Sequence, residues 1–269
     1  MALVPFPGPQ GMAAQLSNDD EEESAGARMS FLDHLDELRR RIVNSCIAIG
    51  VGVAATFYWI EQIFNFILAP TRAALPSGVK LIYTQPGEAF SLYITIALIA
   101  GAVVASPFIM LQVWLFIAPG LYSNEKRLAI PFVLLTTVGF LGGAAFNHYV
   151  AFKYLMVFFG SFNTPDLAFM PKLDDVFGLY SKMLLGMGLV FQMPAIVYFM
   201  ARMSLITASF LVKNIKYAVL IIFIVAAVVT PSPDMMTQVI FAAPMLVLYL
   251  LSIVIAWAVG PKKPKASDA

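Results

Sequence analysis

The feature that most limits the fold of this chain is a series of six long apolar segments joined by short polar connections. A segment of about 20 mostly apolar residues can cross the roughly 30 Å hydrocarbon core of a bilayer as a helix. The six segments cover residues 42–60, 89–118, 128–159, 176–200, 217–230 and 235–259. We therefore expect six transmembrane helices in a concave bundle, with a kink at Pro107 in the second and with the last two helices short.

Composition supports this expectation and excludes other classes. Of the 269 residues, 60% are hydrophobic and 12% are charged, whereas a soluble domain has about 25% charged residues. The chain is therefore predicted to be an all-α polytopic membrane protein. Cys46 is the only cysteine, and the two histidines, His34 and His148, are far apart in the sequence. No disulfide, metal site or cofactor is predicted, and the net charge of +1 gives no reason to expect nucleic-acid binding.

The chain divides into three parts by composition. Residues 1–29 contain an acidic run and few large apolar side chains, so we predict a disordered tail. Residues 30–260 form the predicted membrane domain, and residues 261–269 form a basic tail. Most of the 17 lysines and arginines fall on the side that holds both termini and the polar connections 119–127 and 202–216. The positive-inside rule then places both termini in the cytoplasm.

The segment 30–41, SFLDHLDELRRR, carries a high density of charge directly before the first apolar segment. Ser30 followed by Asp33 is a capping-box pattern and predicts a helix start. Two pairs, Asp36 with Arg40 and Glu37 with Arg41, are each four residues apart, the spacing of an ion pair on one helix face. Two interpretations remain open for this segment. It is either a salt-bridged anchor at the membrane interface or a carboxylate presented to a cationic ligand.

A second acidic residue, Glu125, lies in the connection 119–127 on the same predicted side as Glu37. Two carboxylates at one membrane surface can hold two guanidinium groups, because carboxylate and arginine form bidentate, charge-assisted pairs. The alternative is that Glu125 is an ordinary solvated loop charge.

Other polar residues lie within or between the later apolar segments. Gln192 is in the middle of the fourth segment, where a helix-to-helix hydrogen bond is a more frequent role than a binding site. Thr230, Asp234 and Gln238 surround the connection between the last two segments. These three polar residues either have a functional role or are the polar residues that a proline-rich turn commonly contains.

No motif of a known enzyme class is present, so the chain is predicted not to be an enzyme. A secondary transporter of small molecules or ions is the alternative function. Such a transporter predicts a charged or broken-helix site at mid-membrane and an internal repeat, and the sequence shows neither.

Four motifs, in order, resemble the TatC family, the core of the twin-arginine protein translocase: HLDELRRR, QVWLFIAPGLYSNEKR, GLVFQMPAIV and TPSPDMMTQ. The resemblance covers residues 31–259. It implies a receptor in the bacterial inner membrane that binds twin-arginine signal peptides of folded proteins at the cytoplasmic face. It also implies self-association, single-span partners of the TatA and TatB type, and export driven by the protonmotive force.

The resemblance also assigns roles to individual residues. The family acids that receive the signal arginines match Glu37 and Glu125. The other residues implied to take part are Leu38 and Arg39 in the first motif, Phe116 and Pro119 in the floor of the cytoplasmic loop, Pro70 and Asp234 in outer loops, and Gln192, Thr230 and Gln238 in docking of a partner helix. Some members have glutamate where this chain has Gln192. Because an amide cannot titrate, only a hydrogen-bonding role is expected at that position.

Overall fold

The computed structural model describes residues 9–75, 81–117, 129–162, 164, 169–230 and 234–260, with side chains from residue 32 onward. The backbone in these ranges is helical, apart from the connections and one isolated bridge between Ile82 and Lys172. The elements are α1 (Pro9–Phe57), α2 (Ile60–Ala74), α3 (Glu88–Val104), α4 (Ser106–Ile117), α5 (Ala129–Phe146), a π-helical turn (Asn147–Ala151), α6 (Phe152–Gly160), α7 (Leu173–Val190), α8 (Met193–Arg202), α9 (Ala208–Lys213), α10 (Ile215–Val229) and α11 (Met235–Val259).

The helices follow the predicted apolar segments, and the predicted all-helical fold is confirmed. In the described part of the chain, four helical stretches are long and apolar enough to cross a membrane, namely Leu32–Phe57, Ile130–Gly160, Leu173–Arg202 and Met235–Val259. The bent pair α3 and α4 can provide a fifth, and the shorter apolar helix α10 corresponds to the fifth predicted segment.

The prediction that the last two helices are short is wrong for the second of them. α10 has 15 residues, but α11 has 25. Pro244 lies inside α11 without ending it. Membrane helices tolerate proline because neighbouring groups satisfy the backbone carbonyl that proline leaves free.

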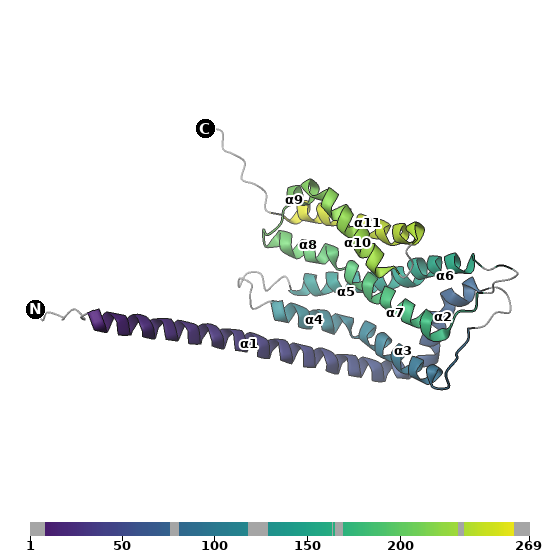
Figure 1. Cartoon of the computed structure of the whole chain (residues 1–269), viewed down its shortest axis with the longest axis horizontal. Coiled ribbons are helices and arrows are strands. Elements are labelled where there is room, and N and C mark those ends of the chain that lie inside the picture. The colour runs from purple at the N-terminus through teal and green to yellow at the C-terminus, as the bar shows by residue number, and fades with distance from the viewer. Residues whose placement is uncertain are drawn as a thin grey trace, which may run out of the picture.

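α1 also begins earlier than predicted. It is continuous from Pro9 to Phe57, so residues 9–29 are helical. Ser30 is therefore not the first residue of the helix. The predicted division of the chain at residues 30 and 260 stays a prediction. Figure 1 shows the first part of α1 extending beyond the ends of the other helices.

The second membrane crossing bends by 58° between α3 and α4. Pro107 is the second residue of α4, where proline lacks the N–H that would continue the hydrogen bonds of α3. The kink predicted at this proline is therefore confirmed.

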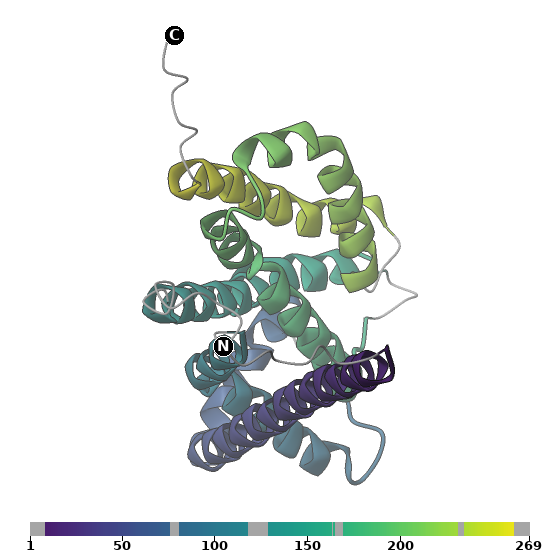
Figure 2. The ribbon, with the colours of Figure 1, turned by 90° about the vertical axis from the view of Figure 1, so that its left-hand side faces the viewer.

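The helices are arranged as a row with α1 at one edge and α9 to α11 at the other (Figures 1 and 2). α1 packs on α3 and α4, α5 lies between α4 and α7, and α11 packs on α8, α9 and α10. The largest fully buried side chains at the centre include Phe152, Met183, Met187, Phe241 and Met245. The C-terminal ends of α4, α8 and α11 lie at the same end of the helix bundle, measured along the helix axes. Polar groups from distant parts of the sequence therefore share that end of the bundle.

Candidate functional site

Of the two ion pairs predicted from spacing, Glu37 with Arg41 is present where α1 meets α4, whereas the described residues include no ion pair of Asp36 with Arg40. The Arg41 Nη2 group donates to Glu37 Oε1 at 3.0 Å. Its Nη1 group donates to Oε1 of Gln112 on α4 at 3.4 Å. The Glu37 and Arg41 side chains are 26% and 24% exposed, whereas Gln112 is buried. Solvent can therefore reach the carboxylate, while the guanidinium is held between the two helices.

An aromatic contact lies one turn away in the same junction. The rings of His34 on α1 and Phe116 on α4 are stacked, with centroids 4.5 Å apart and planes at 22°. Leu38 is partly buried and Arg39 is exposed. The structure thus brings Phe116 close to the charged turn of α1, as a shared site with Glu37 requires. Pro119 and Glu125 lie outside the described residues.

Gln112 was not predicted as part of this site. It is a polar residue in an otherwise apolar helix, and this is the signal that could have identified it. Its partner Arg41 is 71 positions away in the sequence, so spacing alone could not reveal the contact.

A second polar cluster, which was not predicted from the sequence, lies at the end of the helix bundle away from Glu37. Glu88, the first residue of α3, is buried. Its Oε2 accepts the backbone N–H groups of Thr84 at 2.9 Å and Gln85 at 3.2 Å. Its Oε1 accepts the N–H of Asp174 in the first turn of α7 at 3.2 Å, and Lys172 Nζ lies 3.6 Å from Oε2. This carboxylate joins the start of α3 to the start of α7.

Gln192 lies in the break between α7 and α8, not inside a continuous helix. Pro194 follows in the first turn of α8, where the missing N–H carries no penalty. The Gln192 Nε2 group donates to the carbonyl oxygens of Thr136 on α5 at 3.0 Å and Gly188 on α7 at 3.3 Å. Its buried Oε1 has no hydrogen-bond partner among the described residues.

The residues near the start of α11 have partners of their own. Asp234 caps α11, with Oδ2 accepting the N–H of Thr237 at 2.7 Å and its hydroxyl at 2.6 Å. Gln238 donates to the Phe223 carbonyl at 3.0 Å, and Thr230 lies at the end of α10. No hydrogen bond in the described ranges joins Gln192 to Thr230 or Gln238. Among the described residues, no direct hydrogen bond therefore links Gln192 to the other two predicted docking residues.

Pro70 lies inside α2 and is buried. Because α2 belongs to the connection between the first two predicted apolar segments, the assignment of Pro70 to the first outer loop stays a prediction. Among the described residues, no group of three histidine, cysteine, aspartate or glutamate side chains is placed to hold a metal ion.

Several apolar helices of membrane-spanning length, with polar groups gathered at their ends, define a multi-pass helical membrane protein. Comparison with known proteins then identifies the family. The family model for the Sec-independent protein translocase protein (TatC) matches residues 33–244. The chain therefore belongs to the TatC family.

Named relatives agree over most of the chain. TatC of Koribacter versatilis (strain Ellin345) is 42% identical over 237 residues, which are 87% of each chain. TatC of Aquifex aeolicus (strain VF5) is 33% identical over 243 residues, covering 90% of this chain and all of the relative. A crystal structure of a twin-arginine translocase receptor, TatC, superposes with a TM-score of 0.70 at 35% identity, over 83% of this chain and 97% of the other.

These similarities establish the main functional prediction. The chain is a non-enzymatic subunit of the Sec-independent protein translocase, and the alternative of a small-molecule or ion transporter is not supported.

Proposed function

We propose that this subunit is the receptor that binds the paired arginines of signal peptides, through Glu37 and Glu125, at the end of the bundle where α1 meets α4. Leu38, Arg39 and Phe116 lie near Glu37 and take part in the same site, and the family resemblance adds Pro119 as a candidate. The observation that carries the proposal is that the partly exposed Glu37 carboxylate already binds a guanidinium group, that of Arg41. This pair supports a role for Glu37 in binding arginine.

The geometry of this pair indicates how a signal arginine is received. Arg41 contacts only Oε1 of Glu37, and Oε2 has no partner in the described part of the chain. A guanidinium that binds in a bidentate manner needs both oxygens, so the ligand displaces Arg41 from Oε1. Arg41 keeps its bond to Gln112 on α4. A lysine has no planar fork and gains less from the same exchange.

The site lies at the cytoplasmic face in this proposal, with both termini on that side and the chain in the bacterial inner membrane. The lysine and arginine bias supports this orientation. The shared end of α4, α8 and α11 is consistent with it.

Single-span partners of the TatA and TatB type dock near Gln192, Thr230 and Gln238, self-association completes the assembly, and the protonmotive force drives export. The buried Oε1 of Gln192 can accept one more hydrogen bond. A partner helix that docks there therefore needs a donor group at that depth.

The test is binding of a signal peptide with RR, and of its KK variant, to the full chain in nanodiscs. Glu37→Gln and Glu125→Gln are expected to remove the preference for RR. The matched control is Asp36→Asn, because Asp36 is an exposed acid beside Glu37 that lies on a different face of α1. Equal binding of the two peptides by the wild-type chain, or an unchanged preference in both glutamine variants, would refute the proposal.

A further inference from the structure

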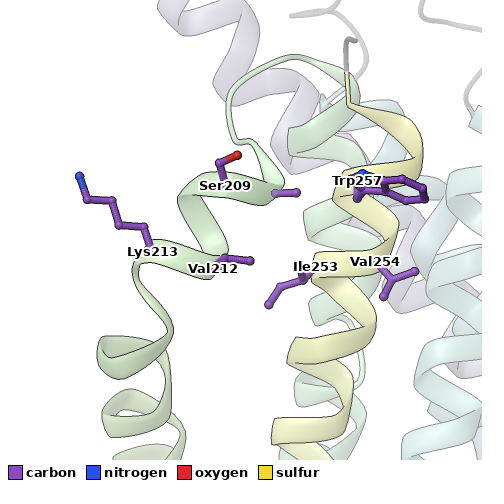
Figure 3. Close-up of a pocket in the computed structure, with 7 residues that line it drawn as sticks. Ser209, Val212, Lys213, Ile253, Val254 and Trp257 are labelled. Atoms are coloured by element: carbon purple, nitrogen blue, oxygen red, sulfur yellow. The ribbon is translucent and has the colours of Figure 1, made fainter. Parts of the chain in front are cut away.

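A groove of about 600 Å³ separates α9 from α11, at the edge of the row opposite α1 (Figure 3). Figure 3 shows Val212 of α9 and Ile253 of α11 facing this space from its two sides. The other lining residues are Ala208, Ser209, Lys213, Val254 and Trp257. Beside the groove, the Tyr249 hydroxyl of α11 donates to the Leu211 carbonyl of α9 at 2.8 Å and holds the two helices together.

Two features of α11 argue that the groove lies near the boundary between bilayer and water. α11 is long and apolar enough to span the membrane, and Trp257 is two residues from its end. Trp257 is 78% exposed, as is typical of tryptophan at a membrane interface. Val212 and Val254 are also exposed. The walls of the groove therefore offer aliphatic surface to an acyl chain.

The edge formed by α8, α9 and α11 carries positive charge at this end of the protein, and the described acids of the same end, such as Asp36 and Glu37, lie on α1 at the opposite edge. Between Asp175 and Asp268 the only acidic residue is Asp234, which lies at the other end of α11. The cations of this region are Arg202, Lys213 and Lys216, and the sequence adds Lys262, Lys263 and Lys265. Both ion pairs in the described residues lie elsewhere, at Glu37 and Glu88.

Lys213 and Ser209 are one helical turn apart on α9, at the rim of the groove. Figure 3 shows the Lys213 side chain extended away from α11. Its flexible stem lets the ammonium group follow a negatively charged headgroup while the aliphatic part stays on apolar surface. An apolar groove with a cationic rim matches a ligand that has an anionic head and a hydrocarbon tail.

We propose that this groove binds an anionic phospholipid, with an acyl chain between α9 and α11 and the phosphate beside Lys213 and Ser209. A zwitterionic lipid fits less well because its own cation meets the uncompensated positive charge. The proposal is independent of the signal-peptide site, which lies at the opposite edge of the row.

The experiment is native mass spectrometry of the delipidated full chain in detergent, titrated with phosphatidylglycerol or with phosphatidylcholine of the same acyl chains. The wild-type chain is expected to bind phosphatidylglycerol several-fold more tightly. Lys213→Gln is expected to lower that affinity about fivefold, since a basic residue at an anionic surface contributes about 1 kcal/mol. Ile253→Trp, which fills the groove, is expected to lower the affinity for both lipids.

Two matched variants control for general effects. Lys182→Gln removes an exposed lysine of α7, and Leu250→Trp adds bulk to an exposed position of α11, both outside the groove. Thermal unfolding of every variant identifies any that fail to fold. Equal affinity for the two lipids, or the same affinity in Lys213→Gln as in Lys182→Gln, would overturn the proposal. Competition by glycerol phosphate as strong as by the lipid would show a simple anion site and would also overturn it.

Discussion

Substitution of Gly52 by alanine is expected to destabilise the protein, because α1 and α3 touch through their backbones at this residue. A Cβ atom on Gly52 would lie 3.0 Å from the carbonyl carbon of Gly101 and closer still to its oxygen, whereas ordinary contact begins at 3.4 Å. A backbone group cannot rotate away, so the two helices must separate. The nearby bond from Thr56 Oγ1 to the Ala97 carbonyl, 3.3 Å long, would lengthen with them.

The magnitude follows from two opposing effects. Inserting a methyl group into a closely packed contact costs about 1–3 kcal/mol. Replacing glycine by alanine inside a helix returns about 0.5–1 kcal/mol. The net loss of unfolding free energy expected for Gly52→Ala is therefore about 0–2.5 kcal/mol, with a central value of about 1 kcal/mol.

Gly50, two residues earlier on α1, provides the matched control. A Cβ atom there meets nothing within 4 Å, so Gly50→Ala is expected to stabilise the protein by about 0.5–1 kcal/mol. Denaturant unfolding in mixed micelles, followed by tryptophan fluorescence, measures both changes. Opposite signs are the expected result. If Gly52→Ala is as stable as Gly50→Ala, the close contact between α1 and α3 is not as described.

Three further predictions concern the polar groups. Arg41→Gln is expected to raise the affinity for an RR signal peptide several-fold, because it removes the guanidinium that competes for Glu37. Isothermal titration calorimetry measures this affinity, and weaker binding would instead make Arg41 a positioning residue. Glu88→Gln is expected to cost about 1–3 kcal/mol of unfolding free energy, because the amide turns a donor toward backbone N–H groups. The control is Glu61→Gln at an exposed position of α2. Equal melting temperatures of the two variants would contradict the role of Glu88 in joining α3 to α7. Gln192→Leu is expected to reduce co-purification of a single-span partner and to lower the unfolding free energy by only about 0.6 kcal/mol, the average for a helix-to-helix hydrogen bond in a membrane protein. Unchanged co-purification would separate Gln192 from docking.

Features that depend on neighbouring residues could be predicted from the sequence. The bend at Pro107 and the pair of Glu37 with Arg41 each follow from local chemistry, and both are present. Contacts between distant residues could not be predicted in this way. Asp174, which Glu88 binds, is 86 positions away, and only packing of α3 against α7 brings the two together.

Proline was a less reliable guide elsewhere in the chain. Pro70 lies inside α2 without ending it, and α11 runs through Pro244. By contrast, the break before Pro194 separates α7 from α8. A proline sequence position alone does not say whether nearby helices can satisfy the carbonyl that it leaves free, so the same residue type marks a break in one helix and none in another.

The length of α10 explains why a groove exists beside α11. The 15 residues of α10 rise about 22 Å, whereas the 25 residues of α11 rise about 37 Å, at about 1.5 Å per residue. The two helices pack together and follow one another in the sequence, so the shorter α10 cannot match α11 along its whole length. The six-residue α9 covers part of the remainder, tied to α11 by the bond from Tyr249 to Leu211. The space left between α9 and α11 faces the interface at the cationic end, and a phospholipid there completes the packing that a longer α10 would otherwise provide.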